Sequence, residues 1–455
     1  MTPPGSAPSG SDPRDRLPRT LTLHDAVFLV VSSTVGSGIF LTPGAIADRL
    51  PHPGLIFAVW TFGGLLALAG ALANAELGAM FPRAGGDYVY LRQAFHPVAG
   101  FLVGWLSFFA IFAGTVAALG VGFAAAAAPL LEWGEEAVVP LAIATVAAVS
   151  VLNYVSVRGG AMANNVTGWI KVGSLLVFGL VGPFTGAGSL EHLRPLAHGV
   201  TEFAAPAALA LALSPVLFSY LGWNSVVYVA SEVRDPGRNL PRSLFIGLGL
   251  CTAIYLLMNA VYLFALPVAE LRNAGNAGEA AASVLFGELG GRLVSGFVLV
   301  SILGTLNATV LVGPRIAYSM ALDGLFVSGV ERVHHRFQTP AWAVTAQGVA
   351  AAGLLVVLQT FPSALDFTTF AILLATMADI AALYRLRQIA PDQPRPYRAW
   401  GYPWVPGLYG LANAGIALGL LWGRPTEALT AVGVLLAGLP FYALWRRLGG
   451  LTDRS

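Results

Sequence analysis

Long apolar segments follow one another along nearly the whole chain, and they limit its possible folds more than any other feature. A helix needs about 20 mostly apolar residues to cross the hydrocarbon core of a bilayer. We therefore predict an all-α integral membrane protein with twelve transmembrane helices. The apolar segments are 25–47, 53–79, 97–127, 135–157, 165–187, 205–230, 241–266, 291–320, 341–360, 364–386, 404–423 and 427–446.

Charged side chains are too few to cover a surface that faces water. Asp, Glu, Lys and Arg make up 11% of the residues, whereas soluble proteins carry roughly 25%. Hydrophobic residues make up 56%, so most of the protein surface is expected to contact the lipid bilayer. A formal net charge of +2 argues against binding of nucleic acid, because phosphate recognition calls for a clustered basic face.

The chemistry-bearing residues do not predict an enzyme. The seven histidines lie in connections or at the ends of apolar segments, and we find no cluster with metal-ligand spacing. There is also no Gly-x-x-x-x-Gly-Lys loop of the kind that cradles phosphates. The single cysteine, Cys251, lies within an apolar run, where a buried thiol is expected. We expect no cofactor and no metal, and a membrane enzyme is the alternative from a different class.

The arginines are distributed unevenly between the two sides of the membrane that twelve spans define. Nineteen lie on the side of both termini and five lie on the opposite side. This positive-inside bias predicts a multi-pass protein of the cell membrane with both termini in the cytoplasm. Residues 1–20 are rich in Pro, Ser, Gly and Arg and lack the apolar core of a signal peptide, which predicts a disordered cytoplasmic tail.

Two of the twelve segments contain residues that interrupt helices. The first contains Gly36 and Gly38 with Pro43 close behind, and the sixth contains Pro215 and Gly222. Irregular backbone at membrane depth survives only when it is buried in protein or lines a cavity. Small residues that merely let neighbouring helices approach are the simpler alternative. However, interruptions five segments apart are typical of transporters built from two inverted repeats of five helices.

Four stretches, in order over most of the chain, are typical of one family. They are Gly36-Ser37-Gly38-Ile39-Phe40; Ala75-Glu76-Leu77-Gly78 with Pro82, Gly85-Gly86 and Tyr88-Val89-Tyr90-Leu91; Phe218 to Asn224 with Glu232, Asp235-Pro236 and Arg238-Asn239-Leu240-Pro241; and Pro314-Arg315, Asp323-Gly324-Leu325-Phe326, Arg395-Pro396-Tyr397-Arg398 and Trp400-Gly401-Tyr402-Pro403. With them the sequence resembles the amino acid–polyamine–organocation (APC) superfamily, and within it the L-type amino acid transporter family.

The resemblance implies a domain organisation of the leucine-transporter type. Residues 21–190 would form a first repeat of helices one to five, and residues 200–388 an inverted second repeat of helices six to ten. Residues 400–447 would add helices eleven and twelve. The substrate would bind midway between the broken first and sixth helices, and the protein would be a transporter that works by alternating access.

By the same resemblance, the main chain at the two breaks recognises the substrate. The N–H groups of Ser37 and Gly38 would bind the carboxylate, since a helix that restarts there presents a positive dipole end. Carbonyl groups freed by the breaks would accept from the ammonium. Phe218 would be an aromatic gate, its alternative role being simple packing, and Asn224 and Trp223 would line the pocket or brace helix six. The substrate-binding residues implied are Thr34, Gly36, Ser37, Gly38, Phe218, Ser219, Leu221 and Asn224.

Lys171 is the only lysine, and it lies inside the fifth apolar segment. Its side chain could reach the cytoplasmic surface about 10 Å away, because a helix rises about 1.5 Å per residue. In sodium-independent relatives, a lysine on helix five occupies the place of the sodium ion of sodium-coupled members. The resemblance therefore implies that Lys171 links helix five to helix one as a substitute for sodium.

Two departures from the family pattern bear on substrate and partner. Leu221 stands where L-type relatives commonly have Gly or Ser, which favours small or medium neutral substrates. The loop from Pro129 to Pro140 has no cysteine, so the disulfide-linked glycoprotein heavy subunit of animal members is excluded. We thus predict sodium-independent transport of neutral L-amino acids, by antiport (exchange) or proton coupling. A polyamine or organic-cation carrier and a channel are the alternatives.

Overall fold

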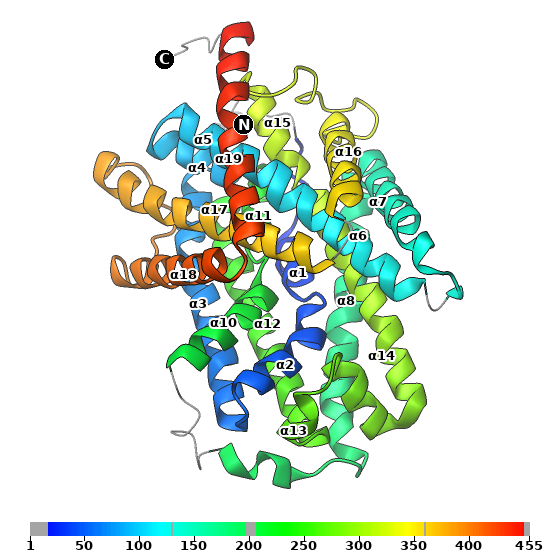
Figure 1. Cartoon of the computed structure of the whole chain (residues 1–455). Coiled ribbons are helices and arrows are strands. Elements are labelled where there is room, and N and C mark those ends of the chain that lie inside the picture. The colour runs from blue at the N-terminus through cyan, green and yellow to red at the C-terminus, as the bar shows by residue number, and fades with distance from the viewer. Residues whose placement is uncertain (1–16, 129–130, 197–205, 359–360, 450–455) are drawn as a thin grey trace, which may run out of the picture.

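The computed structural model describes residues 17–128, 131–196, 206–358 and 361–449, and their regular structure is helical throughout (Figure 1). Each of the twelve apolar segments contains helix. The helices are α1 (Leu23–Thr34), α2 (Gly38–Arg49), α3 (Pro53–Met80), α4 (Asp87–Ala94), α5 (Pro97–Leu106), the π-helix η1 (Ser107–Phe112), α6 (Ala113–Ala127), α7 (Val138–Val155), α8 (Val157–Val181), α10 (Pro206–Tyr220), α11 (Ser225–Tyr228), α12 (Pro236–Ala265), α13 (Val268–Leu271), α14 (Ala277–Val312), α15 (Pro314–Leu322), α16 (Ala341–Leu358), α17 (Phe361–Ile389), α18 (Trp404–Gly423) and α19 (Pro425–Gly449).

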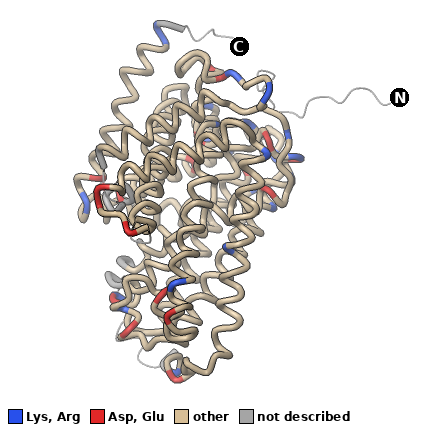
Figure 2. Tube along the Cα trace, turned by 90° about the vertical axis from the view of Figure 1, so that its right-hand side faces the viewer, with Lys and Arg blue, Asp and Glu red and all other residues tan. Residues whose placement is uncertain are grey.

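The helices have the length and composition that a bilayer requires. Among the described residues, nine helical segments are long and apolar enough to cross a membrane, and the bent pair α1 and α2 makes a tenth. Figure 2 shows that charged positions gather in the connections and at helix ends, with long uncharged stretches between them. Large hydrophobic side chains such as Phe62, Val177 and Leu293 are exposed, as expected where lipid replaces water. The protein is therefore a helical, multi-pass membrane protein.

Some boundaries differ from the predicted ones, and polar residues explain why. The fifth segment was expected from residue 165, but α8 begins at Val157 because Ser156 caps its first turn by accepting from the Gly159 N–H at 2.8 Å. Asn164 lies inside this helix and is buried. The connection between the apolar segments 53–79 and 97–127 also contains a helix, because its residues from Asp87 onwards form α4.

Both predicted interruptions are present as breaks in the helices. α1 and α2 meet at an angle of 44°, and four residues separate the end of α10 at Tyr220 from the start of α11 at Ser225. The two breaks face each other. Gly222 adopts a φ of +94°, and a Cβ there would lie 2.6 Å from the Ser33 carbonyl oxygen. A Cβ on Gly38 would lie 2.6 Å from Ser219 Oγ, so glycine is required at both contacts.

Ion pairs join the helices at the end of the molecule where the chain enters α1 and leaves α19 (Figure 1). Glu76 of α3 accepts from Arg387 at 2.6 Å and from Arg395 at 3.2 Å. Arg315 bonds Glu232 at 2.7 Å with both side chains buried. Of the tail expected to be disordered, residues 1–16 lie outside the described residues, but Leu17 is buried.

Candidate functional site

A cavity lies between the two breaks. Its wall comes from both broken helices and from α4, α6, α11, α14 and α17, so segments far apart in the sequence surround one space. All residues that the sequence pointed to for substrate binding border it, namely Thr34, Gly36, Ser37, Gly38, Phe218, Ser219, Leu221 and Asn224. The structure thus brings the whole predicted set together around a single cavity.

The start of α2 gives this cavity a face of backbone donors. The α2 helix begins at Gly38, and the Ser37 carbonyl accepts the N–H groups of Phe40 and Leu41 at 3.1 Å each. The first N–H groups of a helix have no acceptor within the helix. They also form its positive dipole end. A carboxylate is the kind of group that such a helix start binds.

The carbonyl face of the site includes a partner that the sequence reasoning missed. Tyr255 of α12 is buried, and its hydroxyl lies 2.9 Å from the Thr34 carbonyl oxygen and 2.6 Å from that of Ser219. It therefore connects the end of α1 to the end of α10. Each carbonyl oxygen keeps a second lone pair for another donor. In the sequence, Tyr255 is a tyrosine within an apolar run. Its position there indicates only that its buried hydroxyl needs a hydrogen-bond partner.

Lys171 lies beneath the first break and does not extend to the surface. Its side chain is buried, and its Nζ donates to the carbonyl oxygens of Ser32 at 3.0 Å and Val35 at 2.8 Å. It also donates to Thr305 Oγ1 of α14 at 2.8 Å. The ammonium therefore connects α8, the end of α1 and α14. The alternative in which this lysine reaches the cytoplasmic surface is wrong.

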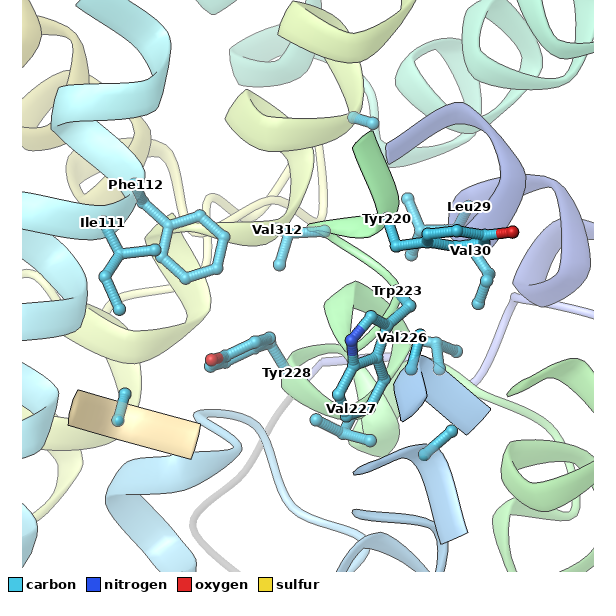
Figure 3. Close-up of a cluster of buried hydrophobic side chains, with 14 of the residues drawn as sticks. Leu29, Val30, Ile111, Phe112, Tyr220, Trp223, Val226, Val227, Tyr228 and Val312 are labelled. Atoms are coloured by element: carbon cyan, nitrogen blue, oxygen red, sulfur yellow. The ribbon is translucent and has the colours of Figure 1, made fainter. Parts of the chain in front are cut away.

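The opposite wall carries an acidic residue that the sequence reasoning did not place there. Asp87, the first residue of α4, borders the cavity and accepts a hydrogen bond from Tyr228 of α11. Asn224 Nδ2 donates to the Tyr228 hydroxyl at 3.3 Å. Figure 3 shows Tyr228 extending towards Phe112 of η1, whose ring centroid is 5.0 Å from that of Tyr228. Asp87 lies outside both broken segments, in the connection that follows the second apolar segment, and no motif there marks it as a cavity residue.

The aromatic residues of the sixth segment divide between cavity and core. Phe218 is half-buried and borders the cavity. Trp223 is buried and packs with its ring centroid 6.5 Å from that of Tyr409 on α18, which matches the bracing alternative. Figure 3 shows Trp223 and Tyr228 pointing in different directions from the same short segment.

A multi-pass helical protein whose two broken helices face one cavity, bordered by the start of α2 and by the ends of α1 and α10, has the architecture of a membrane transporter. Comparison with known proteins agrees. The family model described as amino acid permease matches residues 21–442, and the chain belongs to this family of the APC superfamily. It is therefore an L-type-like transporter and not an enzyme.

Curated relatives cover nearly the full length of the chain. The serine/threonine exchanger SteT of Bacillus subtilis is 31% identical over 94% of this chain and 96% of its own length. The human b(0,+)-type amino acid transporter 1 is 29% identical over 94% of this chain and 88% of its own length. The human Asc-type amino acid transporter 1 is 28% identical over 97% of this chain and 85% of its own length.

Proposed function

We propose that this protein is a sodium-independent secondary transporter of neutral L-amino acids that works by alternating access. The observation that carries the proposal is the meeting of two backbone faces at one cavity, with the α2 start on one side and the α1 and α10 ends on the other. A free amino acid has a carboxylate and an ammonium that both need partners away from water. The relatives named as amino acid exchangers and transporters support the same substrate class.

The proposed binding mode uses main-chain groups for the part that all α-amino acids share. The N–H groups of Ser37 and Gly38 bind the carboxylate. The ammonium donates to the remaining lone pairs on the carbonyls of Thr34 and Ser219, and to those of Phe218 and Leu221, while the Phe218 ring covers the substrate. Recognition of this kind leaves selectivity for the side chain to the rest of the cavity wall.

The proposed cycle uses two inverted repeats, from residues 21–190 and 200–388, with residues 400–447 forming two further helices. In this scheme α1 and α10 would be the first helices of the respective repeats, so their breaks would occupy matching positions. Both termini are proposed to face the cytoplasm, as the arginine distribution indicates. Rocking of one repeat against the other around the substrate then exposes the cavity to each side in turn.

The protein is proposed to work without a disulfide-linked heavy subunit. Its one cysteine, Cys251, is buried. A thiol inside the α12 helix and packed away from solvent cannot bond a partner chain at the membrane surface.

Leu221 sets the proposed preference for small or medium neutral side chains, such as those of alanine, serine and valine. It borders the cavity and follows the Tyr220 end of the α10 helix. Each methylene that is buried contributes about 0.8 kcal/mol, so a side chain that intrudes into the cavity reorders the substrates that fit.

A carrier for polyamines or other organic cations is a second candidate, and one observation favours it. Asp87 borders the cavity, and an acidic side chain is what a cationic substrate without a carboxylate requires. An amino acid transporter needs the substrate carboxylate, which binds the N–H groups at the start of α2. A cation carrier does not need it, because an amine bound through Asp87 makes no contact with those groups.

We expect neutral amino acids to compete for transport while their amides and their decarboxylated amines do not. Each of these analogues loses a charged group and with it charge-assisted hydrogen bonds worth about 1.5–3 kcal/mol apiece, or at least tenfold in affinity. The measurement is inhibition of labelled alanine uptake into proteoliposomes by a series of neutral, basic and aromatic amino acids and by the analogues. Equal inhibition by the decarboxylated amine would favour the cation carrier, and arginine or tryptophan as the best inhibitor would contradict the role of Leu221.

A further inference from the structure

A second polar cluster lies beside the cavity, where α4, α11 and α17 meet. Asp87 begins α4 and Asp379 lies within α17, and both side chains are completely buried. The two carboxyl groups lie next to each other and interact electrostatically. Oδ1 of Asp87 and both oxygens of Asp379 accept no hydrogen bond from any side chain or backbone group in the described part of the chain. Two buried carboxyl groups in contact and short of donors need an explanation.

Neutral polar groups of the same cluster are also without partners. Asn74 of α3 is buried and its amide interacts with Asp379, but neither its Oδ1 nor its Nδ2 has a partner in good hydrogen-bond geometry among the described residues. The buried Tyr90 hydroxyl, which interacts electrostatically with both carboxyl groups, has no hydrogen-bond partner there either. Buried polar side chains without a good hydrogen-bond partner, next to two carboxyl groups, indicate a binding site for a small ligand or ion.

No basic side chain faces this pair among the described residues. The groups that interact with it are Tyr228 of α11, Tyr90 of α4 and Tyr409 of α18. Arg92 of α4 is bonded to Asp323 and Arg387 of α17 to Glu76. The remaining ionisable side chains of α4, of α17 and of the helices packed against them are Tyr88, Arg315, Tyr318, Asp366, Tyr384, Arg385, Glu427, Tyr442, Arg446 and Arg447.

Two adjacent carboxylates with no cation beside them cannot both stay ionised in a dry site. The smallest ligand that resolves the conflict is a proton, which removes one charge and supplies the missing donor. We propose that Asp87 and Asp379 hold one proton between them, and that this proton moves with the substrate. This inference rests on the proposed transport function and names the ion that drives it.

The surroundings decide which carboxyl group carries the proton. Asp87 is the first residue of the eight-residue α4, where the helix dipole stabilises a negative charge. It also accepts a hydrogen bond from the Tyr228 hydroxyl. Asp379 lies within α17, so its negative charge is stabilised neither by a helix start nor by the Tyr228 hydroxyl. The proton therefore belongs to Asp379, which donates towards Asp87.

The site is placed so that substrate binding and proton binding can affect each other. Asp87 and Tyr228 border the cavity, as does Thr376, which lies one turn before Asp379 on α17. Tyr228 belongs to α11, the second half of the broken sixth segment. When α11 moves away from α4 during the cycle, the Tyr228–Asp87 hydrogen bond breaks and water reaches the pair. The proton is then released on that side of the membrane.

The test compares uptake by proteoliposomes with and without an inward proton gradient. One proton per substrate allows about tenfold accumulation for each pH unit of gradient. We expect the wild type to accumulate a neutral amino acid when the gradient is imposed, and to carry protons inward as reported by a trapped pH-sensitive dye. In Asp379→Asn, the ratio of uptake with the gradient to uptake without it should fall to about one. Asp87→Asn is the second variant and should lose the gradient effect as well.

Asp366→Asn is the matched control, because Asp366 lies on the same helix but is paired with Arg424 at 3.4 Å, away from the cluster. It should keep the wild-type response to the gradient. An infrared spectrum should also show the C=O stretching band of a protonated carboxylic acid in the wild type and in Asp366→Asn, and not in Asp379→Asn. This band tests the proton even if a variant no longer transports.

A wild type that ignores the gradient, an Asp379→Asn variant that still responds to it, or a wild type without the infrared band would each overturn the proposal. Failure of the proposed function is a different result. In that case the wild type does not exchange amino acids even at equal pH on both sides, whether or not the infrared band is present.

Discussion

Replacing Lys171 with alanine is expected to slow transport by about 100-fold or more while changing substrate affinity much less. The ammonium donates to the carbonyl oxygens of Ser32 and Val35, at the end of α1, from the neighbouring α8 and next to Thr305 of α14. Charge-assisted hydrogen bonds contribute about 1.5–3 kcal/mol each, and about 1.4 kcal/mol corresponds to tenfold in rate. Lys171 does not border the cavity, so its loss acts on the movement of α1 rather than on substrate contacts.

The same argument predicts that transport by the wild type does not require sodium, because Lys171 supplies a positive charge where the main chain of α1 is open. Uptake in sodium and in choline medium should be equal, and binding to Lys171→Ala should be measured separately from its transport. Ser174→Ala is the control on the same helix, since its hydroxyl bonds to the Ile170 carbonyl of its own helix and to no other group in the described part of the chain. Strict sodium dependence of the wild type, or full activity of Lys171→Ala, would contradict the proposed role.

A second large effect is expected for Gly38→Ala, which should lower transport by about tenfold or more and destabilise the protein. The new Cβ would lie 2.6 Å from Ser219 Oγ and 2.9 Å from Ser219 Cα. A side chain can rotate away, but the backbone of the α10 helix can only move as a whole. Overpacking of this kind typically costs about 1–3 kcal/mol, and here it also pushes apart the two backbone faces that are proposed to hold the substrate.

Gly173→Ala provides the comparison, because a Cβ at Gly173 meets no atom within 4 Å. There the change should be neutral or stabilise the α8 helix by up to about 1 kcal/mol, since alanine favours helix over glycine. Uptake and the thermal unfolding of the purified proteins in detergent are the measurements. If Gly38→Ala and Gly173→Ala behave alike, the close approach of α2 and α10 is not essential.

The sequence was sufficient to predict which parts of the chain are helical and where the two breaks occur. The long apolar runs and their interrupting glycines and prolines are local signals, and each of the twelve segments contains helix. The start of α8 was misplaced because Asn164 and Arg158 look unlike a membrane segment, although the helix continues through them. The α4 helix was missed because its short, charged sequence has no apolar run.

The candidate site was predicted on its broken-helix side but not on the opposite side. The motif around Gly36 and the run from Phe218 to Asn224 pointed to residues that do border one cavity. Asp87 and Asp379 are 292 positions apart, and only the packing of α4 against α17 brings them together. No spacing in the sequence relates them. For the same reason, Tyr255 could be noted as a polar group in an apolar run, but its link between Thr34 and Ser219 could not.

The most direct test of the central claim, that the cavity between the broken helices carries neutral amino acids across the membrane, is uptake by proteoliposomes of the purified protein. Labelled alanine, serine and threonine are added outside vesicles that contain either unlabelled amino acid or buffer, at equal pH on both sides. The account predicts uptake well above that of protein-free vesicles, faster when amino acid is present inside, and about tenfold or more slower in Gly38→Ala. Uptake no greater than in protein-free vesicles under every one of these conditions would contradict it.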